Sequence, residues 1–181
     1  AYGFDERRKG LRHLDLPAAH AQIKGDPAAG LCKIAAVDRT HQPGKLFTGL
    51  IRGFGLARGA AACSAAWDTS DIVVVGADEA DMACAVNRIA DLQGGAVLCE
   101  GGRVLAEIAL PVFGIASARP VAELAARLEG FKGAIQGLGV GFDDPLLSLV
   151  TLTGAAIPYL RICEEGLVNL KDGKTLSLFV S

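Results

Sequence analysis

The sequence has few of the features that mark a nucleic-acid-binding or membrane protein. Its 18 lysines and arginines are balanced by 20 aspartates and glutamates, which gives a net charge of −2. No basic field is therefore present to attract nucleic acid or an anionic membrane surface. The apolar runs are shorter than the ~20 residues that a membrane-spanning helix needs, and no signal peptide is visible. We expect neither a nucleic-acid partner nor a membrane association.

Potential metal ligands are equally scarce. His13, His20 and His41 show no ligand spacing, and no two of the five cysteines form a Cys-x-x-Cys pair. These absences exclude the common zinc motifs, so we expect no metal and no cofactor. An odd number of cysteines, scattered along mostly apolar segments, is typical of reduced thiols in a cytoplasmic protein.

The common catalytic and nucleotide-binding motifs are also missing. The sequence contains no Gly-x-Ser-x-Gly element and no phosphate-binding loop ending in Gly-Lys-Ser/Thr. Gly53-Phe54-Gly55 is not part of a Gly-x-Gly-x-x-Gly motif that joins a strand to a helix. The residues alone therefore predict no reaction, and we assign no catalytic residue.

What the chain does have is apolar content. Hydrophobic residues make up 51% of its 181 residues, and its mean hydropathy is +0.36. A chain of this length forms one domain with a proper core, so we expect residues 1–181 to be a single domain with an irregular segment over 1–29. The apolar excess also favours an additional buried surface, either an oligomer contact or a docking face.

Local patterns predict both helices and hairpins. Capping by Asp78 and the Gly94-Gly95 stop predict one helix. A second is expected to start near Ser117, with a buried face of Val121, Leu124, Ala125 and Leu128 and a weak end in 130–141. Strands are expected over 31–37, 58–66, 72–75, 96–99, 103–108, 159–163 and 167–170, with hairpin turns at 101–102 and 172–173. Residues 146–157 fit a helix or a strand. Helices separated by hairpins indicate an α+β fold.

A polar cluster precedes the clearest strand. Asp68, Thr69, Ser70 and Asp71 come directly before Ile72–Val75, and Arg39 follows another predicted strand. One interpretation is a small-molecule site in which these carboxylates and hydroxyls bind a polar ligand and Arg39 faces one carboxylate. The other is a turn whose side chains satisfy local backbone donors.

Several stretches resemble the C-terminal domain family of bacterial adenine deaminases, in order and with similar spacing over roughly residues 30–170. They are 38–44, 53–56, 58–60, 67–68, 73–76, 81–83, 85–88, 94–95, 110–111 with Gly114 and Ser117, 144–145, Leu149, 157–161 and 166–168. The resemblance implies an α+β domain with a largely antiparallel sheet flanked by helices. In that family the domain follows a metal-binding barrel that hydrolyses adenine to hypoxanthine and ammonia.

The departures from the family pattern bear on activity. Where the family typically has His-Asp-Ser-His-Asn, this chain has Trp67-Asp68-Thr69-Ser70-Asp71, and Asp38-Arg39-Thr40 replaces Glu-Arg-His. Imidazole can bind a metal or move protons near neutral pH, and the residues that replace it here cannot. The barrel is also absent from these 181 residues, so we expect no catalysis by this chain alone.

Two hypotheses of different kinds remain. In the first, the domain binds a small polar, purine-like molecule, with Arg39 and 68–71 as ligand-binding residues, or it is an assembly module that forms a homodimer or docks to a barrel-containing partner. The region expected to make either contact is 53–71. In the second, it is a small hydrolase or deaminase for a purine-like or cyclic amide substrate, with Asp68 or Asp71 as general base. A closed pocket in which Arg39 faces a carboxylate of raised pKa would favour the second.

Overall fold

A large, mostly antiparallel sheet forms the centre of the computed structural model, which describes residues 2–5, 10–13, 24–157, 159–176 and 178. Its strand order is β2-β1-β4-β3-β6-β5-β7-β8. The bounds are β1 Tyr2–Asp5, β2 Gly10–His13, β3 Leu31–Val37, β4 Leu46–Arg52, β5 Ala60–Cys63, β6 Ile72–Gly76, β7 Gly95–Glu100 and β8 Arg103–Ala109. Only the short β1–β4 pairing is parallel among these described strands.

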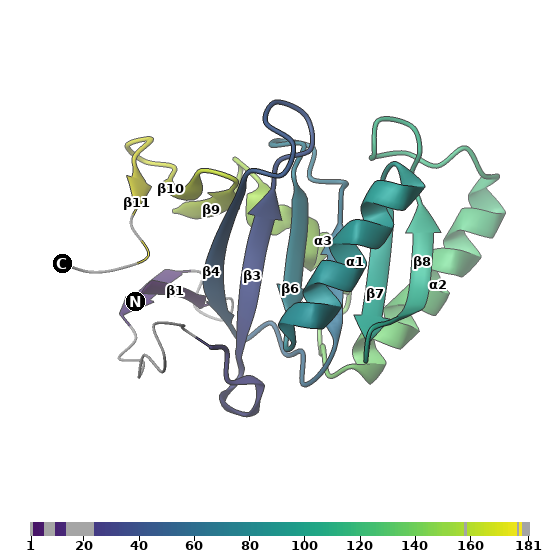
Figure 1. Cartoon of the computed structure of the whole chain (residues 1–181), viewed down its shortest axis with the longest axis horizontal. Helices are drawn as coiled ribbons and strands as arrows, with labels where there is room; N and C mark the ends of the chain where they lie inside the picture. Colours follow the sequence, from purple (N-terminus) through teal and green to yellow (C-terminus); the bar gives the residue numbers. More distant parts are fainter. Residues whose placement is uncertain (1, 6–9, 14–23, 158, 177, 179–181) are drawn as a thin grey trace.

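A second, three-stranded sheet lies beside one end of the first (Figure 1). It consists of β9 Leu160–Cys163, β10 Gly166–Asn169 and β11 Thr175–Leu176, in the order β11-β10-β9. The turn between β10 and β11 contains Asp172-Gly173, so the predicted hairpin is confirmed.

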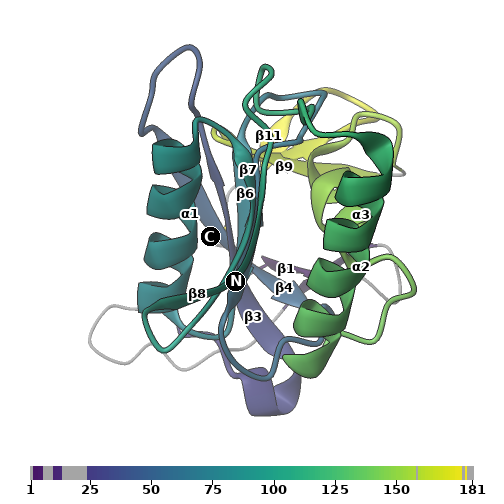
Figure 2. The same ribbon diagram turned by 90° about the vertical axis from the view of Figure 1, so that its right-hand side faces the viewer.

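Helices cover both faces of the large sheet (Figure 2). Helix α1 (Glu79–Leu92) lies on one face, and α2 (Val121–Gly137) and α3 (Pro145–Val150) lie on the other. Short 3₁₀ turns, η1 (Pro27–Ala29) and η2 (Thr151–Thr153), complete the elements. The predicted α+β fold with a largely antiparallel sheet is therefore confirmed.

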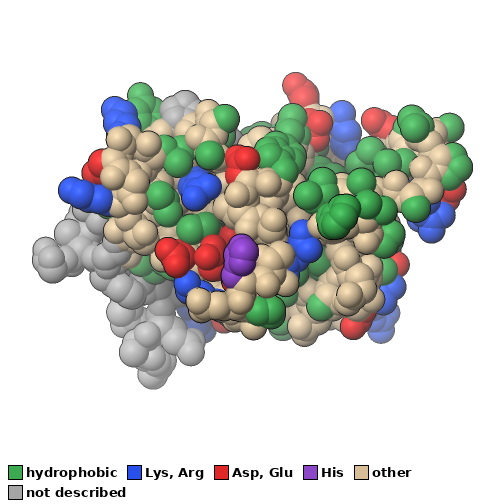
Figure 3. Space-filling model, turned by 90° about the horizontal axis from the view of Figure 1, so that it is seen from above, with side chains coloured by type: hydrophobic (Ala, Val, Ile, Leu, Met, Phe, Trp, Pro, Cys, Tyr) green, Lys and Arg blue, Asp and Glu red, His purple; other side chains and the backbone are tan. Residues whose placement is uncertain are grey.

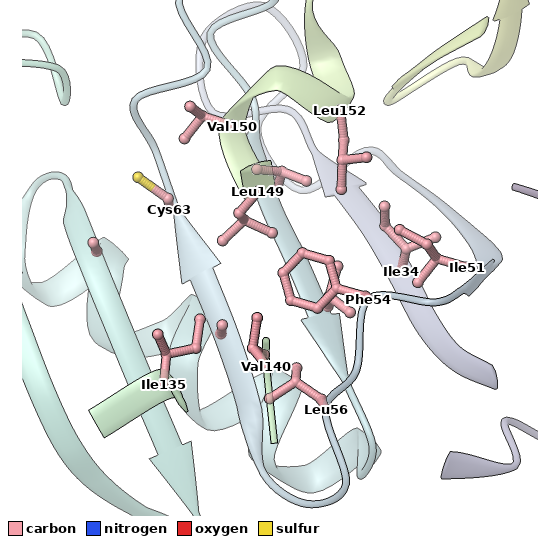
Figure 4. Packing of buried hydrophobic residues seen from close by; sticks show 14 of the residues in the cluster. Ile34, Ile51, Phe54, Leu56, Cys63, Ile135, Val140, Leu149, Val150 and Leu152 are labelled. Atoms are coloured by element: carbon pink, nitrogen blue, oxygen red, sulfur yellow. The ribbon is translucent and has the colours of Figure 1, made fainter. Parts of the chain in front are cut away.

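The main core lies between the sheet and the α2–α3 side (Figure 4). Phe54, two residues after the end of β4, is fully buried there and packs edge-on against Phe142, with ring centroids 5.6 Å apart. A smaller cluster, rich in alanine and valine, fills the space under α1. Small side chains allow the helix to lie close to the strands, which explains the alanine content of β5.

Helix α1 forms where the sequence predicts it. The carboxylate of Asp78 accepts a hydrogen bond from the Asp81 N–H (3.0 Å), which satisfies a donor of the first turn. The helix ends at Gln93, which is in the left-handed conformation at φ 59°, followed by Gly94 at φ 124°. Asp81 is itself buried and accepts from the N–H groups of Gly101 and Gly102, so the start of α1 is bonded to the β7–β8 turn.

Helix α2 differs from the prediction. It continues through Gly130 and Gly133 to Gly137, where the sequence predicts a weak end and a loop. Its buried residues are Phe131 and Ile135 rather than the predicted face, and Val121 is 84% exposed. A helical glycine costs only about 1 kcal/mol, which the burial of one large side chain offsets.

Other differences are smaller. The segment 146–157, left open between helix and strand, contains α3 except for its first residue, followed by η2. The strand predicted over 58–66 is shorter, since β5 spans only Ala60–Cys63. Residues 1–29, predicted to be irregular, contain β1, β2 and η1. Strand β1 pairs with the neighbouring β2 and also with β4, a partner almost fifty residues away that local sequence cannot reveal.

Strand register brings several loops to one edge of the large sheet. Val37 pairs with Ile72, Cys63 pairs with Ala96, and Gly95 pairs with Ala109. The loops 38–45, 64–71 and 110–119 therefore lie together with Gln93–Gly95 at the end of the sheet that is uppermost in Figure 1. We call this set of residues the upper edge.

Candidate functional site

Arg39 joins two loops of the upper edge. Its Nη2 donates a hydrogen bond to the backbone oxygen of Phe113 (2.7 Å). Gly114 has a positive φ of 73°, and a Cβ at this position would lie 2.7 Å from Cζ of Arg39, so the guanidinium rests directly on the glycine backbone. Its Nε is buried without a hydrogen-bond partner among the residues that the structure describes. Arg39 thus fixes loop 110–119 against loop 38–45.

Asp38 organises the loop that carries Arg39. Its buried carboxylate accepts hydrogen bonds from the N–H groups of Thr40, His41 and Gln42, at 2.7, 3.0 and 2.6 Å. These bonds, that from Thr40 first, lower the pKa of Asp38 to about 2. The carboxylate is therefore ionised at neutral pH and is fully used in shaping the loop.

The cluster 68–71 forms a turn. The Ser70 N–H donates to the Ala66 oxygen (2.7 Å), and Ser70 has a positive φ of 63°. The hydroxyl of Thr69 accepts from the Asp71 N–H (3.3 Å). Asp68, at the exposed surface, accepts from the N–H of Ala155 (2.6 Å). These contacts match the turn interpretation of the sequence, and a ligand-binding role of the four residues stays a prediction.

Asp71 is the one carboxylate of this turn in an unusual environment. It is 1% exposed, and its Oδ2 accepts from the N–H of Glu164 (3.3 Å). Burial raises the pKa of Asp71 to about 6. The hydrogen bond with the Thr69 hydroxyl opposes this rise, and the neighbouring carboxylates of Glu164 and Asp38 add to it. The side chain connects the start of β6 to the β9–β10 turn.

The structure separates Arg39 from these carboxylates. A hollow of about 420 Å³ lies between loop 38–45 and the second half of α1. Asp38, Arg39, Asn87 and Gln93 supply its polar lining, and none of residues 68–71 lines it. Arg39 directs its guanidinium to Phe113, so the predicted set of site residues divides between this hollow and the contacts of loop 64–71 with the C-terminal segment.

Ser64 is a central residue of the upper edge that sequence reasoning missed. It is fully buried at the end of β5, and its hydroxyl donates to the Gly114 oxygen (2.7 Å) and accepts from the Gly95 N–H (2.8 Å). It therefore bonds loop 110–119 to the start of β7, next to the contact that Arg39 makes. A serine among small residues carries no local signal for this role.

The upper edge also exposes large apolar side chains (Figure 3). Phe113 is 85% exposed and Trp67 is 53% exposed, and Val112 and Ile115 are exposed as well. Phe113 has a positive φ of 55°, and its backbone oxygen is the acceptor for Arg39. Two hydrogen-bonded loops, 64–71 and 110–119, thus present these side chains to solvent, an arrangement typical of an interaction surface.

The part of the chain that the structure describes lacks two features of other protein classes. It contains no group of three His, Cys, Asp or Glu side chains placed to hold a metal ion; His20 lies outside this part. No helix among these residues is long and apolar enough to cross a membrane.

Comparison with known proteins decides the family. The sequence model of the adenine deaminase C-terminal domain family matches residues 9–174 of the chain. The chain belongs to the adenine deaminase C-terminal domain family. This finding confirms the resemblance seen in the sequence.

Relatives of this adenine deaminase C-terminal domain are much longer than the chain itself. The chain is 43% identical over 159 residues to an adenine deaminase of Methylobacterium sp. (strain 4-46), a match that covers 88% of the chain and 28% of the relative. It is 38% identical over 167 residues to one of Dehalococcoides mccartyi (strain CBDB1), covering 91% and 29%. The chain thus spans less than a third of the length of the curated relatives it matches.

Proposed function

We propose that this adenine deaminase C-terminal domain is a docking module that packs through its upper edge against the catalytic part of an adenine deaminase, and that it does not catalyse on its own. The observation that carries the proposal is the exposure of Phe113 and Trp67 on loops whose backbone is fixed by hydrogen bonds. Holding these loops rigid lowers the entropic cost of association.

The length of the relatives supports this partner. The chain aligns with 28% of the Methylobacterium adenine deaminase, so most of that protein lies outside the aligned segment. Aromatic residues presented at a surface of this kind tend to dominate binding energy. A second copy of the chain is the competing partner, and the test below distinguishes the two.

The test mixes the chain with the part of the Methylobacterium adenine deaminase that lies outside the aligned segment, and measures the mass of the mixture by light scattering after size exclusion. We expect one complex with one copy of each polypeptide. Phe113→Ser should weaken the association at least about tenfold, which corresponds to 1.4 kcal/mol. Leu105→Ser is the matched control, because Leu105 is 48% exposed but lies on β8 outside the upper edge.

We also propose that the hollow beside Arg39 binds a small polar, purine-like molecule. Its lining combines Arg39 with the Asn87 amide, and these residues supply donors and acceptors that suit the edge of a planar heterocycle. Adenine at about 100 times its dissociation constant should raise the unfolding temperature by several degrees, and Asn87→Ala should remove the shift. An equal shift in wild type and variant would contradict this assignment.

The hydrolase alternative receives no support from the geometry and is not proposed. A general base must reach the proton that it removes, whereas Asp71 is 1% exposed and Asp68 bonds the backbone of Ala155.

We propose a cytoplasmic location, because all five cysteines are free thiols, the state favoured by a reducing compartment.

A further inference from the structure

Two thiols from different elements meet under α1. Cys84 lies in the middle of α1 and Cys99 near the end of β7, and the thiol of Cys99 donates to Sγ of Cys84 at 2.7 Å. Both are free cysteines. A disulfide bond is about 2.05 Å long, so the two sulfur atoms need to approach by only about 0.7 Å to bond. Small rotations of the two side chains can supply this movement.

The fold holds the two thiols in this position. Asp81, one turn before Cys84 on α1, accepts hydrogen bonds from the backbone of Gly101 and Gly102, directly after β7. Cys99 is also fixed in register, paired with Ala60 of β5. The contact between the thiols therefore follows from how α1 is bonded to the sheet, and it does not depend on a mobile loop.

We propose that Cys84 and Cys99 form a reversible intramolecular disulfide when the domain meets a low-molecular-weight disulfide such as oxidised glutathione. Cys84 is half-buried and Cys99 is fully buried, so Cys84 is the more accessible of the two residues and the one expected to meet the reagent first. Burial, with a further contribution from the adjacent Cys84, raises the pKa of Cys99. Cys84 is thus the attacking thiol and Cys99 the resolving one.

The reaction balances as two thiol–disulfide exchanges. The Cys84 thiolate attacks one sulfur of the reagent, whose S–S bond breaks, and the released thiolate takes a proton from water. Cys99 then loses its proton to solvent and attacks Sγ of Cys84, which displaces the second half of the reagent as a thiol. The two cysteines lose two electrons in total, and the small disulfide is reduced to two thiols.

The cross-link would stabilise the folded domain. It closes the segment from Cys84 to Cys99, which contains Gln93–Gly95, and Gly95 bonds Ser64. A closed loop of about 15 residues restricts the unfolded chain. Oxidation should therefore raise the unfolding temperature of the domain by roughly 5–10 °C, and a dithiol reductant should reverse the change.

The test treats the folded protein with oxidised glutathione and determines its intact mass, its free thiols and its peptide map without reduction. We expect the loss of two hydrogen atoms, three remaining thiols and one linked peptide that joins Cys84 to Cys99. Cys84→Ser should abolish both the link and the rise in unfolding temperature. Cys163→Ser is the matched control, because Cys163 is buried in β9 and should leave both unchanged.

Three results would overturn the proposal. The first is a protein that keeps all five thiols under these conditions. The second is a stable adduct of glutathione on Cys84 without the internal link. The third is a link that appears only when urea unfolds the chain, which would mean that the native position of the thiols does not promote the bond. Cys84→Ser changes a half-buried residue, so the folding of this variant is checked by far-ultraviolet circular dichroism, which should match that of the wild type.

Discussion

The buried carboxylate of Asp71 gives a sharp prediction for stability. Its pKa rises from an ordinary value of 3.8 to about 6, chiefly because the side chain is buried. Each pKa unit corresponds to about 1.4 kcal/mol, so keeping Asp71 ionised in the folded state costs about 3 kcal/mol at neutral pH. Asp71→Asn removes the charge, while its amide oxygen can still accept from the Glu164 N–H.

The sign of the pH effect follows from the direction of the shift. The folded protein binds the Asp71 proton more tightly than the unfolded chain does, so stability should increase as the pH falls through about 6, with the gain complete below about 4. Asp38 acts in the opposite direction, because its pKa is lowered to about 2 and its contribution is lost only below about pH 4. The pKa of Glu107 is also lowered, by its hydrogen bond with Arg88, so its contribution is lost only as the pH falls below its ordinary value of 4.5. From about pH 5 to pH 7, the change of stability due to a shifted carboxylate of the described residues is therefore that of Asp71.

Urea unfolding followed by circular dichroism at about pH 7.5 and about pH 4.5 measures both effects. Asp71→Asn should be more stable than wild type by up to about 3 kcal/mol at the higher pH, and the difference should shrink at the lower pH. Asp68→Asn is the control, because Asp68 is exposed and should change stability by less than about 0.5 kcal/mol. A variant Asp71→Asn that is less stable than wild type at pH 7.5 would refute the reasoning.

Three further substitutions test hydrogen bonding and packing at the upper edge and on α2. Ser64→Ala should lower the free energy of unfolding, measured with urea, by about 2 kcal/mol, because it leaves the buried N–H of Gly95 without its partner. A change below about 0.5 kcal/mol would show that another group replaces the hydroxyl. Gly94→Ala should cost more than about 2 kcal/mol, because its Cβ would lie 2.4 Å from the Gly114 Cα at a φ of 124°. Gly133→Ala lies on α2 with nothing within 4 Å of the new Cβ, so it should instead raise the free energy of unfolding by about 0.5–1 kcal/mol. Equal effects of Gly94→Ala and Gly133→Ala would contradict the packing described for these two positions.

The parts of the fold that the sequence predicts correctly depend on local signals. The cap of Asp78, the Gly94-Gly95 stop and the turn at Asp172-Gly173 each act within a few residues, and each element lies where expected. The extent of α2 is not local, because the burial of Phe131 and Ile135 against the core determines how far the helix continues past Gly130.

The candidate site divides in the same way. The turn formed by 68–71 could be read from its residue types, since Asp, Thr and Ser satisfy nearby backbone groups. The partner of Arg39 could not, because Phe113 lies 74 positions along the chain. Ser64 gives no sequence signal either, although its hydroxyl connects two segments of the upper edge. The sequence thus indicates the residue types near a site, and the fold decides which of them meet.

Hydrogen–deuterium exchange of the chain, alone and mixed with the part of the Methylobacterium adenine deaminase outside the aligned segment, tests the docking proposal most directly. The account predicts slower exchange in the amides of 64–71 and 110–119 when the partner is present, with Phe113→Ser removing the protection. Exchange in β8 and in the β7–β8 turn, which lies at the opposite end of the strands, should be unchanged. Protection of β8 and this turn in place of the upper edge, or no protection anywhere at concentrations that saturate the mixture, would contradict it.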